Sequence, residues 1–579
     1  MAHYSQFVTL ACVCLAAAAG ATAAAGAAAT ASVILQPKVN QLGYLPDGPK
    51  RFVIVVESAR PGDAFQVLDE AGTVAYEGRL GTAPMDDAAS SGEVVLQGDF
   101  SPLTRPGRYT VRVNAVQSHP FAISAEVYDR LYHDALRCFY LIRANAPLDD
   151  PVTGLAHPAG HHDAEYDTRP GEFGDFTGGW YNAGDYGKWT HEAAFSAAYM
   201  MWLYELRAKV AGGAAAGDVI SADDSGIPES GNGVPDILDQ ARWGLEWLLK
   251  MQNADGGVYH KVDTEPAFAW GLPPEKDPHP RKVRYGHAFS TVDAATLTAA
   301  MAQAARVFRP FDAQFAETCR RAAERSWPWV VAHPDLVQND PYYVRNETWQ
   351  ERLWALGEMC RLTGDAKLAT DFARAVDEHE LSQPNWNAPQ ALGYLAVITA
   401  PGLPADLREK VTAALVRAAE ARLRTARAAG YGVALRPQDY VWGSAAHVAG
   451  WANLMLMAYG LTGRLEFRNG AQAQLDYLLG VNALDQCFVT GYGTRRNEHP
   501  YHWTWRVYQK TMPGWLTGGP NRYPYGADPP LRKLQETGAP PQKCWLDLSM
   551  DGGSWASNEG ATDQNAALVF LSGWFAGRR

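Results

Sequence analysis

The spacing of apolar residues changes at about residue 125, and this change determines the fold class. Between residues 33 and 124, short runs rich in Val, Ile, Phe and Thr alternate with Gly, Pro and Asp, which is typical of a small β-sandwich. From residue 126 onward, apolar residues recur at the three- and four-residue spacing of helices. At 579 residues the chain is too long for one small domain. We therefore expect a β-sandwich over 33–124 followed by an all-α domain over 126–579.

The individual elements follow from the same patterns. The first part contains five clear strand candidates: 52–56, 65–68, 73–76, 94–96 and 109–113. The second part contains nine clear helix candidates and three weaker ones: 190–210, 234–252, 290–308, 312–332, 347–363, 406–428, 441–461, 466–479 and 559–575, then 126–143, 366–379 and 388–399. About twelve helices could stack as a solenoid, but the sequence shows no internal repeat period.

The amino-terminal residues 1–31 are predicted to be a signal peptide. The segment is apolar and rich in Ala, and it contains two Ala-x-Ala endings, at 21–23 and 29–31, that suit a signal peptidase. The segment lacks Lys and Arg before its apolar run, which is a departure from the usual pattern. We expect a secreted or periplasmic protein without a membrane span, since no later run of 18 apolar residues exists.

Composition narrows the possible partners. The formal net charge of −12 argues against a nucleic-acid partner and suits a neutral substrate. The 19 Trp and 26 Tyr residues supply flat apolar faces of the kind on which sugars stack. Five Cys residues follow the leader, without any Cys-x-x-Cys pair, so we expect buried free thiols. We expect the chain to act as a monomer.

Two segments carry the acidic groups of a candidate active site. Asn182-Ala183-Gly184-Asp185 places an acid on a loop rich in Gly, Trp and Tyr, just before a long helix pattern. This Asp could simply cap the helix, and Lys188 is expected to be solvated. A second acid, Glu559, lies near the carboxyl end of the chain in the segment 558–566. Two carboxyl groups brought together by the fold are the minimum equipment for hydrolysing a glycosidic bond.

These segments resemble the motifs of family 9 glycoside hydrolases, the cellulase family. The segments 231–239, 488–493 and 518–521 also fit that family, in the expected order. The resemblance implies an immunoglobulin-like module over 33–124 and a six-hairpin (α/α)6 barrel over 126–579. It also implies that Asp185 is the general base and Glu559 the general acid of an inverting reaction, with the two carboxyl groups about 6.5–9.5 Å apart.

The sequence departs from the family in the surroundings of these acids. Asn182 stands where the family has an Asp that helps to hold the nucleophilic water, and an amide brings no charge. The family's Pro-His-His-Arg is replaced by Pro500-Tyr501-His502-Trp503, so aromatic surface replaces a polar clamp. We therefore expect Asn182, Tyr501, His502 and Trp503 to bind substrate.

A zinc site of the kind found in many relatives is not expected. Ala144 and Gly160 stand where those relatives have Cys ligands, and His161 alone cannot hold the ion. His191-Glu192 begins like a zinc-protease helix, but Phe195 occupies the position of the required second His. The acidic loop 223–233 is a possible calcium site or simply the cap of the next helix. No cofactor is required for the expected reaction.

Three functions are compatible with the sequence. The first is an exported endoglucanase that hydrolyses β-1,4-glucan. The second keeps the mechanism but shortens the substrate, as in exo-acting β-glucosidases or β-glucosaminidases that act on oligosaccharides. The third is a polysaccharide-binding protein that has lost catalysis, because the family's Asp, His and Arg are missing at three positions.

Overall fold

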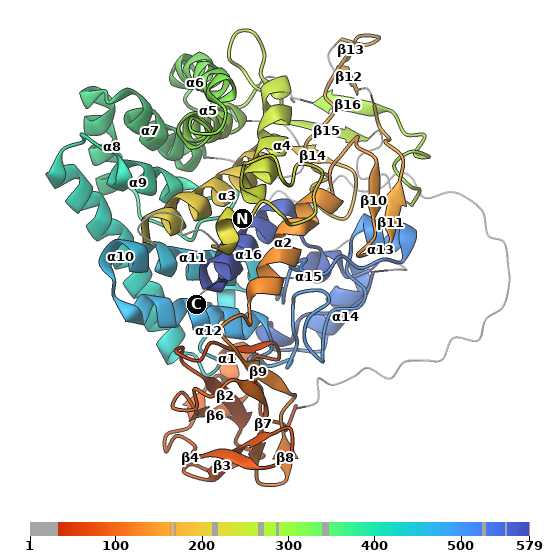
Figure 1. Cartoon of the computed structure of the whole chain (residues 1–579), viewed down its shortest axis with the longest axis vertical. Helices are drawn as coiled ribbons and strands as arrows, with labels where there is room; N and C mark the ends of the chain where they lie inside the picture. Colours follow the sequence, from red (N-terminus) through yellow and green to blue (C-terminus); the bar gives the residue numbers. More distant parts are fainter. Residues whose placement is uncertain are drawn as a thin grey trace, which may run out of the picture. The chain divides into compact units, whose positions relative to one another are not determined.

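The computed structural model describes residues 33–162, 164–166, 169–210, 218–264, 271–284, 289–337, 347–523, 528–549 and 553–577. The predicted signal peptide, residues 1–31, lies outside the described residues. Figure 1 shows strands in the amino-terminal part of the chain and mostly helices in the rest.

The amino-terminal part is a two-sheet β structure, as predicted. One sheet has the strand order β1-β9-β7-β3-β4, with β8 paired to β7, and the other has the order β2-β6-β5. Phe52, Phe65, Phe100 and Phe121 are buried between them and pack with their rings 4.9–6.4 Å apart. The strand bounds are β1 Gly43–Tyr44, β2 Arg51–Val55, β3 Ala64–Asp69, β4 Val74–Arg79, β5 Met85–Asp86, β6 Val94–Asp99, β7 Gly107–Val113, β8 Val116–Gln117 and β9 Phe121–Ile123, with the short helix α1 at Ala88–Ser91.

The rest of the described chain is dominated by helices. Each of the twelve predicted helices is present, with ends that differ by at most three residues from the prediction: α2 Asp129–Leu141, α3 Thr190–Val210, α4 Asp236–Met251, α5 Thr291–Val307, α6 Ala313–Ala332, α7 Trp349–Thr363, α8 Ala366–Glu378, α9 Gln390–Thr399, α10 Ala405–Ala428, α11 Ser444–Thr462, α12 Leu465–Leu478 and α16 Thr562–Phe575. The short helices are α13 Trp503–Tyr508, α14 Pro529–Glu536 and α15 Trp555–Asn558, with the 3-10 turns η1 Val219–Ser221, η2 Pro437–Asp439 and η3 Pro541–Lys543.

The long helices form an inner and an outer set. In the inner set α11 packs against α16, α16 against α3, α3 against α5, α5 against α7, and α7 against α9. Each of these also packs against one outer helix: α16 with α2, α3 with α4, α5 with α6, α7 with α8, α9 with α10, and α11 with α12. The inner helix α16 is buried along its whole length, whereas α8 buries only Ala369, Phe372 and Val376. A helix that is apolar all round belongs in the interior of a domain, and one with a single apolar stripe belongs outside.

Short strands lie in the connections between helices, and the sequence analysis did not predict them. They are β10 Leu148–Asp150, β11 Leu155–His157, β12 Ala164–Tyr166, β13 Phe173–Gly174, β14 Lys188–Trp189, β15 Lys261–Thr264 and β16 Arg281–Arg284. Strands of two to four residues are too short to show a two-residue period. The sheet β13-β12-β16-β15-β14 connects the segment after Asp185 to the segment that precedes α5.

Buried polar contacts join the β module to the helical domain. Glu93 accepts hydrogen bonds from Lys38 at 3.0 Å and from Lys543 at 2.8 Å, and all three are buried. Asn40 donates to Asp476 of α12 at 2.8 Å. Removing one partner of a buried charged pair costs about 3–5 kcal/mol, because the other charge is left uncompensated. These contacts show that the module packs against the helical domain.

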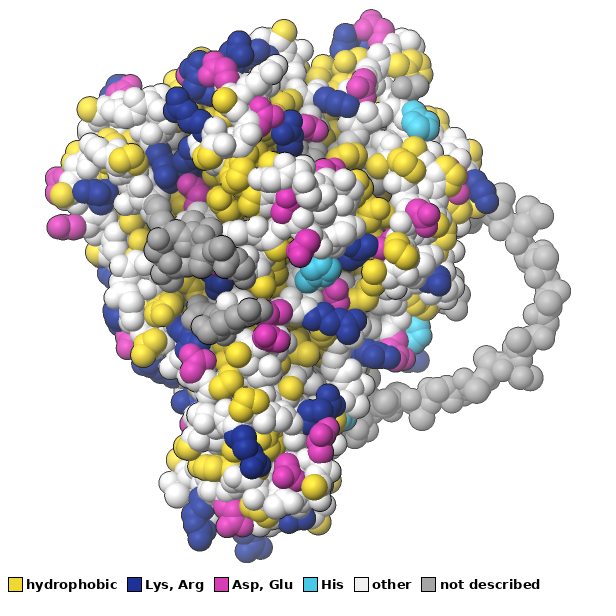
Figure 2. Space-filling model, viewed as in Figure 1, with side chains coloured by type: hydrophobic (Ala, Val, Ile, Leu, Met, Phe, Trp, Pro, Cys, Tyr) yellow, Lys and Arg dark blue, Asp and Glu magenta, His cyan; other side chains and the backbone are white. Residues whose placement is uncertain are grey.

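The surface is mixed in charge. Figure 2 shows Lys and Arg side chains interspersed with Asp and Glu over the visible face of the described residues. Among the described residues, none of the helices has the length and apolar character needed to cross a bilayer.

Candidate active site

Lys188 stabilises the loop that carries Asp185. The Lys188 side chain is buried and its Nζ donates to Asn145 Oδ1 at 3.0 Å, Phe176 O at 2.6 Å and Gly178 O at 3.0 Å. Its burial lowers the pKa of Lys188 well below the usual value. The expectation of a solvated lysine was wrong, because the three oxygens replace water around the ammonium group.

Gly184 brings the two acidic motifs together. The Gly184 N–H donates to Glu559 Oε1 at 3.0 Å, although the two residues are 375 positions apart. A Cβ on Gly184 would stand 2.7 Å from the Tyr501 ring and 2.8 Å from Glu559 Oε1, so a side chain here would displace one or both of these groups. Asp185 is oriented by its own loop, since Gly187 N–H donates to Asp185 Oδ1 at 2.5 Å. Both carboxyl groups are half-buried.

The surroundings raise the pKa values of the two acids to different extents. Burial, followed by the nearby Asp185 charge, raises the pKa of Glu559 to about 8, against the opposing effects of Gly184 N–H and Arg506. Burial, followed by the Asp263 charge, raises the pKa of Asp185 to about 6. Near neutral pH, Glu559 therefore holds its proton while Asp185 is mostly ionised. A separation of this kind is typical of a carboxyl pair in which one group acts as acid and the other as base.

Asn182 lies beneath the site and joins two elements. Its side chain is 2% exposed, and its Oδ1 accepts a hydrogen bond from the Thr562 hydroxyl at 2.5 Å. Thr562 N–H also donates to the Asn182 carbonyl at 2.9 Å, which fastens the Asp185 loop to the start of α16. Glu192 of α3 and Asp563 of α16 are buried in the same region, and burial raises the pKa of both. This differs from the predicted contact between Asn182 and substrate.

The three aromatic positions 501–503 have different roles. Tyr501 is half-buried and its ring lies against Gly184. His502 is fully buried and caps α13, where its Nδ1 accepts from Thr504 N–H at 3.2 Å, and burial lowers its pKa to about 3. Trp503 is also fully buried, and packs against Tyr181 with the ring centres 5.7 Å apart. Of the three, only Tyr501 offers surface to a sugar, because stacking requires an exposed ring face.

Sequence reasoning missed two charged neighbours of the acids. Arg506 lies over the Tyr501 ring at 4.1 Å and lowers the pKa of Glu559, so it returns a guanidinium to a region from which the family's Arg is missing. The only sequence signal for Arg506 was its position, five residues after Tyr501 and within the short helix α13. Asp263 of β15 is buried, and a Cβ on Gly187 would stand 3.0 Å from Asp185 Oδ1 and 3.7 Å from Asp263 Oδ1. No local motif marks Asp263.

The region of the family's zinc site is built from other contacts. His161 lies between the Tyr181 hydroxyl, 2.7 Å from its Nδ1, and Asp277 Oδ2, 2.9 Å from its Nε2. Burial lowers the pKa of His161 to about 4. Ala144 is fully buried, and a Cβ on Gly160 would collide with the Pro274 backbone at 2.4 Å. These residues do not fit the ion, since a single imidazole cannot replace four ligands.

The predicted acidic loop does gather oxygen donors. Carboxylate oxygens of Asp223, Asp236 and Asp239 lie within 4.8 Å of one another. Asp223 is fixed by Gly231 N–H and Gly233 N–H, each at 2.7 Å. Burial, followed by the charges of Glu229, Asp236 and Asp223, raises the pKa of Asp239 to about 6 against an opposing hydrogen bond from Asn232. Carboxylate oxygens of this kind could hold calcium, which takes six to eight oxygen ligands.

The chain is similar to known glycoside hydrolases over nearly its whole length. It is 33% identical to Endoglucanase C of Cellulomonas fimi over 93% of this chain, and it spans 52% of that longer protein. It is 32% identical to a cellulose 1,4-beta-cellobiosidase of Acetivibrio thermocellus, over 94% of this chain and 67% of that protein. The crystal structure of a metagenome-derived family 9 endoglucanase superposes with a TM-score of 0.84 at 35% identity, covering 93% of this chain and 99% of that one.

Two family profiles cover the two parts of the chain. The profile described as cellulase N-terminal ig-like domain matches residues 36–118, which hold strands β1 to β8 of the β module. The profile described as Glycosyl hydrolase family 9 matches residues 128–572, which hold the helices and both acids. The predicted resemblance is thereby confirmed, and the chain belongs to glycosyl hydrolase family 9.

Proposed function

We propose that this protein hydrolyses β-1,4-glucan with inversion, using Asp185 as base and Glu559 as acid. The hydrogen bond from Gly184 N–H to Glu559 Oε1 carries the proposal, because it places the acid beside the residue next to the base. The different pKa values of the two carboxyl groups support the assignment of roles. The substrates named for the relatives, cellulose among them, support the choice of glucan.

In this mechanism each acid has one task. Glu559 donates its proton to the glycosidic oxygen as the bond to the anomeric carbon breaks. Asp185 accepts a proton from a water molecule that attacks the anomeric carbon from the opposite face. Arg506 and Tyr501 lie beside Glu559, where the guanidinium helps to stabilise the carboxylate left after proton transfer. The next turnover requires the proton to pass back from Asp185 to Glu559 through solvent.

The pH dependence of kcat/KM should be bell-shaped with an optimum near pH 7. Asp185 must be ionised, so activity should fall as pH decreases through about 6. Glu559 must be protonated, so activity should also fall as pH increases through about 8. Because the two carboxyl groups interact, the two apparent pKa values of the profile describe the pair together. Initial rates measured from pH 4 to 10 give both values. A profile without an alkaline limb would contradict the assignment of Glu559 as the acid.

The products of hydrolysis distinguish endo action from exo action. Endo action is the first candidate, because the superposing structure is described as an endoglucanase. Exo action on short oligosaccharides is the second, favoured by similarity at 28% identity to a cellodextrinase of Butyrivibrio fibrisolvens. Time courses on cellohexaose, carboxymethylcellulose and chitosan oligomers test both. A rapid fall in carboxymethylcellulose viscosity supports endo action, glucose or cellobiose alone supports exo action, and no product from any substrate refutes hydrolysis.

We also infer the domain organisation and location from these features. Residues 33–124 form the immunoglobulin-like module, and residues 126–579 form one catalytic domain. The inner helices α11, α16, α3, α5, α7 and α9 pack in succession, each with an outer partner, which supports a six-hairpin barrel. The leader over residues 1–31 supports export to the periplasm or the medium. We expect a monomer.

Calcium should stabilise the fold through the acidic loop. Three carboxylates within 4.8 Å repel one another, and a calcium ion would neutralise that repulsion. At a calcium concentration of about 100 Kd, binding would stabilise the folded state by about 2.7 kcal/mol. Thermal unfolding with calcium and with magnesium measures the effect, and Asp236→Asn should abolish it. If calcium does not change the melting temperature, the loop does not bind calcium and acts only as the cap of the next helix.

A further inference from the structure

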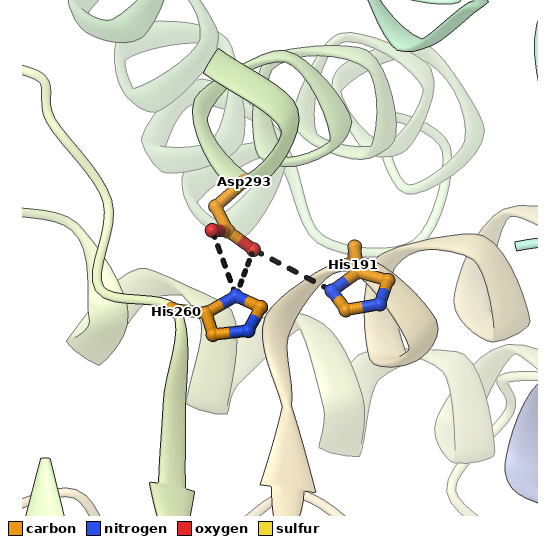
Figure 3. A group of neighbouring side chains, drawn as sticks. All are labelled: His191, His260 and Asp293. Atoms are coloured by element: carbon orange, nitrogen blue, oxygen red, sulfur yellow. Dashed lines mark hydrogen bonds and ion pairs between the residues drawn. The ribbon is translucent and has the colours of Figure 1, made fainter. Parts of the chain in front are cut away.

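A buried group of two histidines and one aspartate lies outside the residues assigned to the reaction. His191 is in the first turn of α3, His260 directly precedes β15, and Asp293 is in the first turn of α5. All three side chains are at most 1% exposed. Figure 3 shows them pointing toward one another from these three elements. The fold thus assembles the group from positions 69 and 33 residues apart along the chain.

The donor atoms of the group lie at the separations found around a small metal ion. His260 Nδ1 lies 3.2 Å from Asp293 Oδ1 and 3.0 Å from Asp293 Oδ2, and His191 Nδ1 lies 3.6 Å from Asp293 Oδ1. With bonds of 2.0–2.1 Å, the ligand atoms of a tetrahedral zinc ion stand about 3.3–3.4 Å apart. Two imidazoles and one carboxylate form the ligand set of many three-ligand zinc sites.

The elements that carry the ligands are held in place. The Ser290 side chain caps α5 and donates to Asp293, which orients that carboxylate. Trp189 packs edge-on against His260 and His191, with ring centres 5.1 Å and 6.2 Å apart. A carboxylate fixed in this way is oriented to coordinate a cation.

We propose that His191, His260 and Asp293 form a binding site for one divalent cation of the zinc type, with water as a further ligand. Nitrogen donors favour zinc, cobalt and nickel, whereas calcium and magnesium favour the all-oxygen loop at Asp223. Protons compete with the ion for the imidazole nitrogens, so binding weakens at low pH. The site lies beside Trp189. A Cβ on Gly187 would stand 3.1 Å from Trp189 Nε1 and 3.0 Å from Asp185 Oδ1, so Trp189 lies between the site and the proposed base. A bound ion would therefore help to fix the position of Trp189 next to that base.

The proposal does not rest on glycan hydrolysis and is tested by metal binding alone. The full chain is freed of metal with a chelator and titrated with zinc chloride at pH 7 and at pH 5.5 by calorimetry. We expect one equivalent to bind, and to bind more weakly at pH 5.5. Cobalt should give a visible absorption band, because its d–d spectrum reports nitrogen and oxygen coordination. Both ions should raise the melting temperature.

Variants then assign the site. Asp293→Asn keeps the size of the side chain but removes the charge, and His260→Ala removes a donor. Each should weaken zinc binding by more than the 10–100-fold that loss of an outer-shell partner costs. His133→Asn on the surface of α2 and Asp236→Asn at the start of α4, beside the acidic loop, are the controls, and both should bind zinc like the parent protein. Circular dichroism confirms that each variant is folded.

Three results would overturn the proposal. The first is that the parent protein does not bind one equivalent of zinc or cobalt. The second is that Asp293→Asn and His260→Ala bind zinc as tightly as the parent protein. The third is that Asp236→Asn abolishes zinc binding. The first would leave a hydrogen-bonded Asp–His group without an ion, and the last would move the ion to the acidic loop. If the binding variants do not fold, the cobalt spectrum of the parent decides, since a spectrum of six oxygen ligands excludes the two imidazoles.

Discussion

Glu559→Gln should lower kcat on cellohexaose by about two to four orders of magnitude, the usual size of a general acid–base contribution. The amide keeps the shape of the side chain and can still accept the Gly184 N–H, but it has no acidic proton to give to the leaving oxygen. Binding of the oligosaccharide should change little. Steady-state kinetics together with calorimetric titration of the variant separate the two quantities.

The leaving group provides an internal control for this variant. A dinitrophenol departs without a proton, so hydrolysis of dinitrophenyl β-cellobioside should lose much less activity than hydrolysis of cellohexaose. Glu536→Gln, an exposed residue on α14, should behave like the parent protein on both substrates. Equal losses of Glu559→Gln on both substrates would show that Glu559 is not the proton donor.

Asp185→Asn should lower kcat by a similar factor, but on both substrates alike. Water must be activated whichever group leaves, and an amide cannot take the proton from it. The hydrogen bond from Gly187 to the side chain can be retained, so the loop should keep its shape and the melting temperature should stay close to that of the parent.

A matched control and one contrary result complete this test. Asp149→Asn on β10 removes an exposed carboxyl group elsewhere and should leave kcat unchanged. Near-normal turnover of Asp185→Asn would mean that another carboxylate activates the water. Asp263 would be the first to examine, because its Oδ1 and Asp185 Oδ1 both lie within 4 Å of the position that a Cβ on Gly187 would take.

Much of the fold could be predicted because its elements are long and regular. The helices of the inner and outer sets were located from their apolar spacing, and the five main strands of the module from their alternation with turn residues. The strands β12 to β16 were not predicted, because two to four residues carry no usable period. They matter to the site, since β14 follows Asp185 and β15 carries Asp263.

The site was predicted in part. Local motifs located Asp185 and Glu559, and the spacing of the motif marked Tyr501 as a neighbour. The same motif suggested that Trp503 faces the sugar, but the ring is buried against Tyr181, because the helix α13 turns it inward. Arg506 places a cation near Glu559, as the Arg of the family motif would. It lies at a different position in the sequence, so comparing the motifs did not identify it.

The sequence by itself determined which elements form, which family the chain resembles and which two acids we propose as the catalytic pair. These properties depend on residues close together in the chain, where periodicity and motif spacing can be seen directly. The tertiary structure alone decided that Gly184 meets Glu559, that Lys188 is enclosed by three oxygens, and that His191, His260 and Asp293 converge. Their partners are separated by tens to hundreds of residues, and the protonation and burial of such groups arise only when helix packing excludes water from between them.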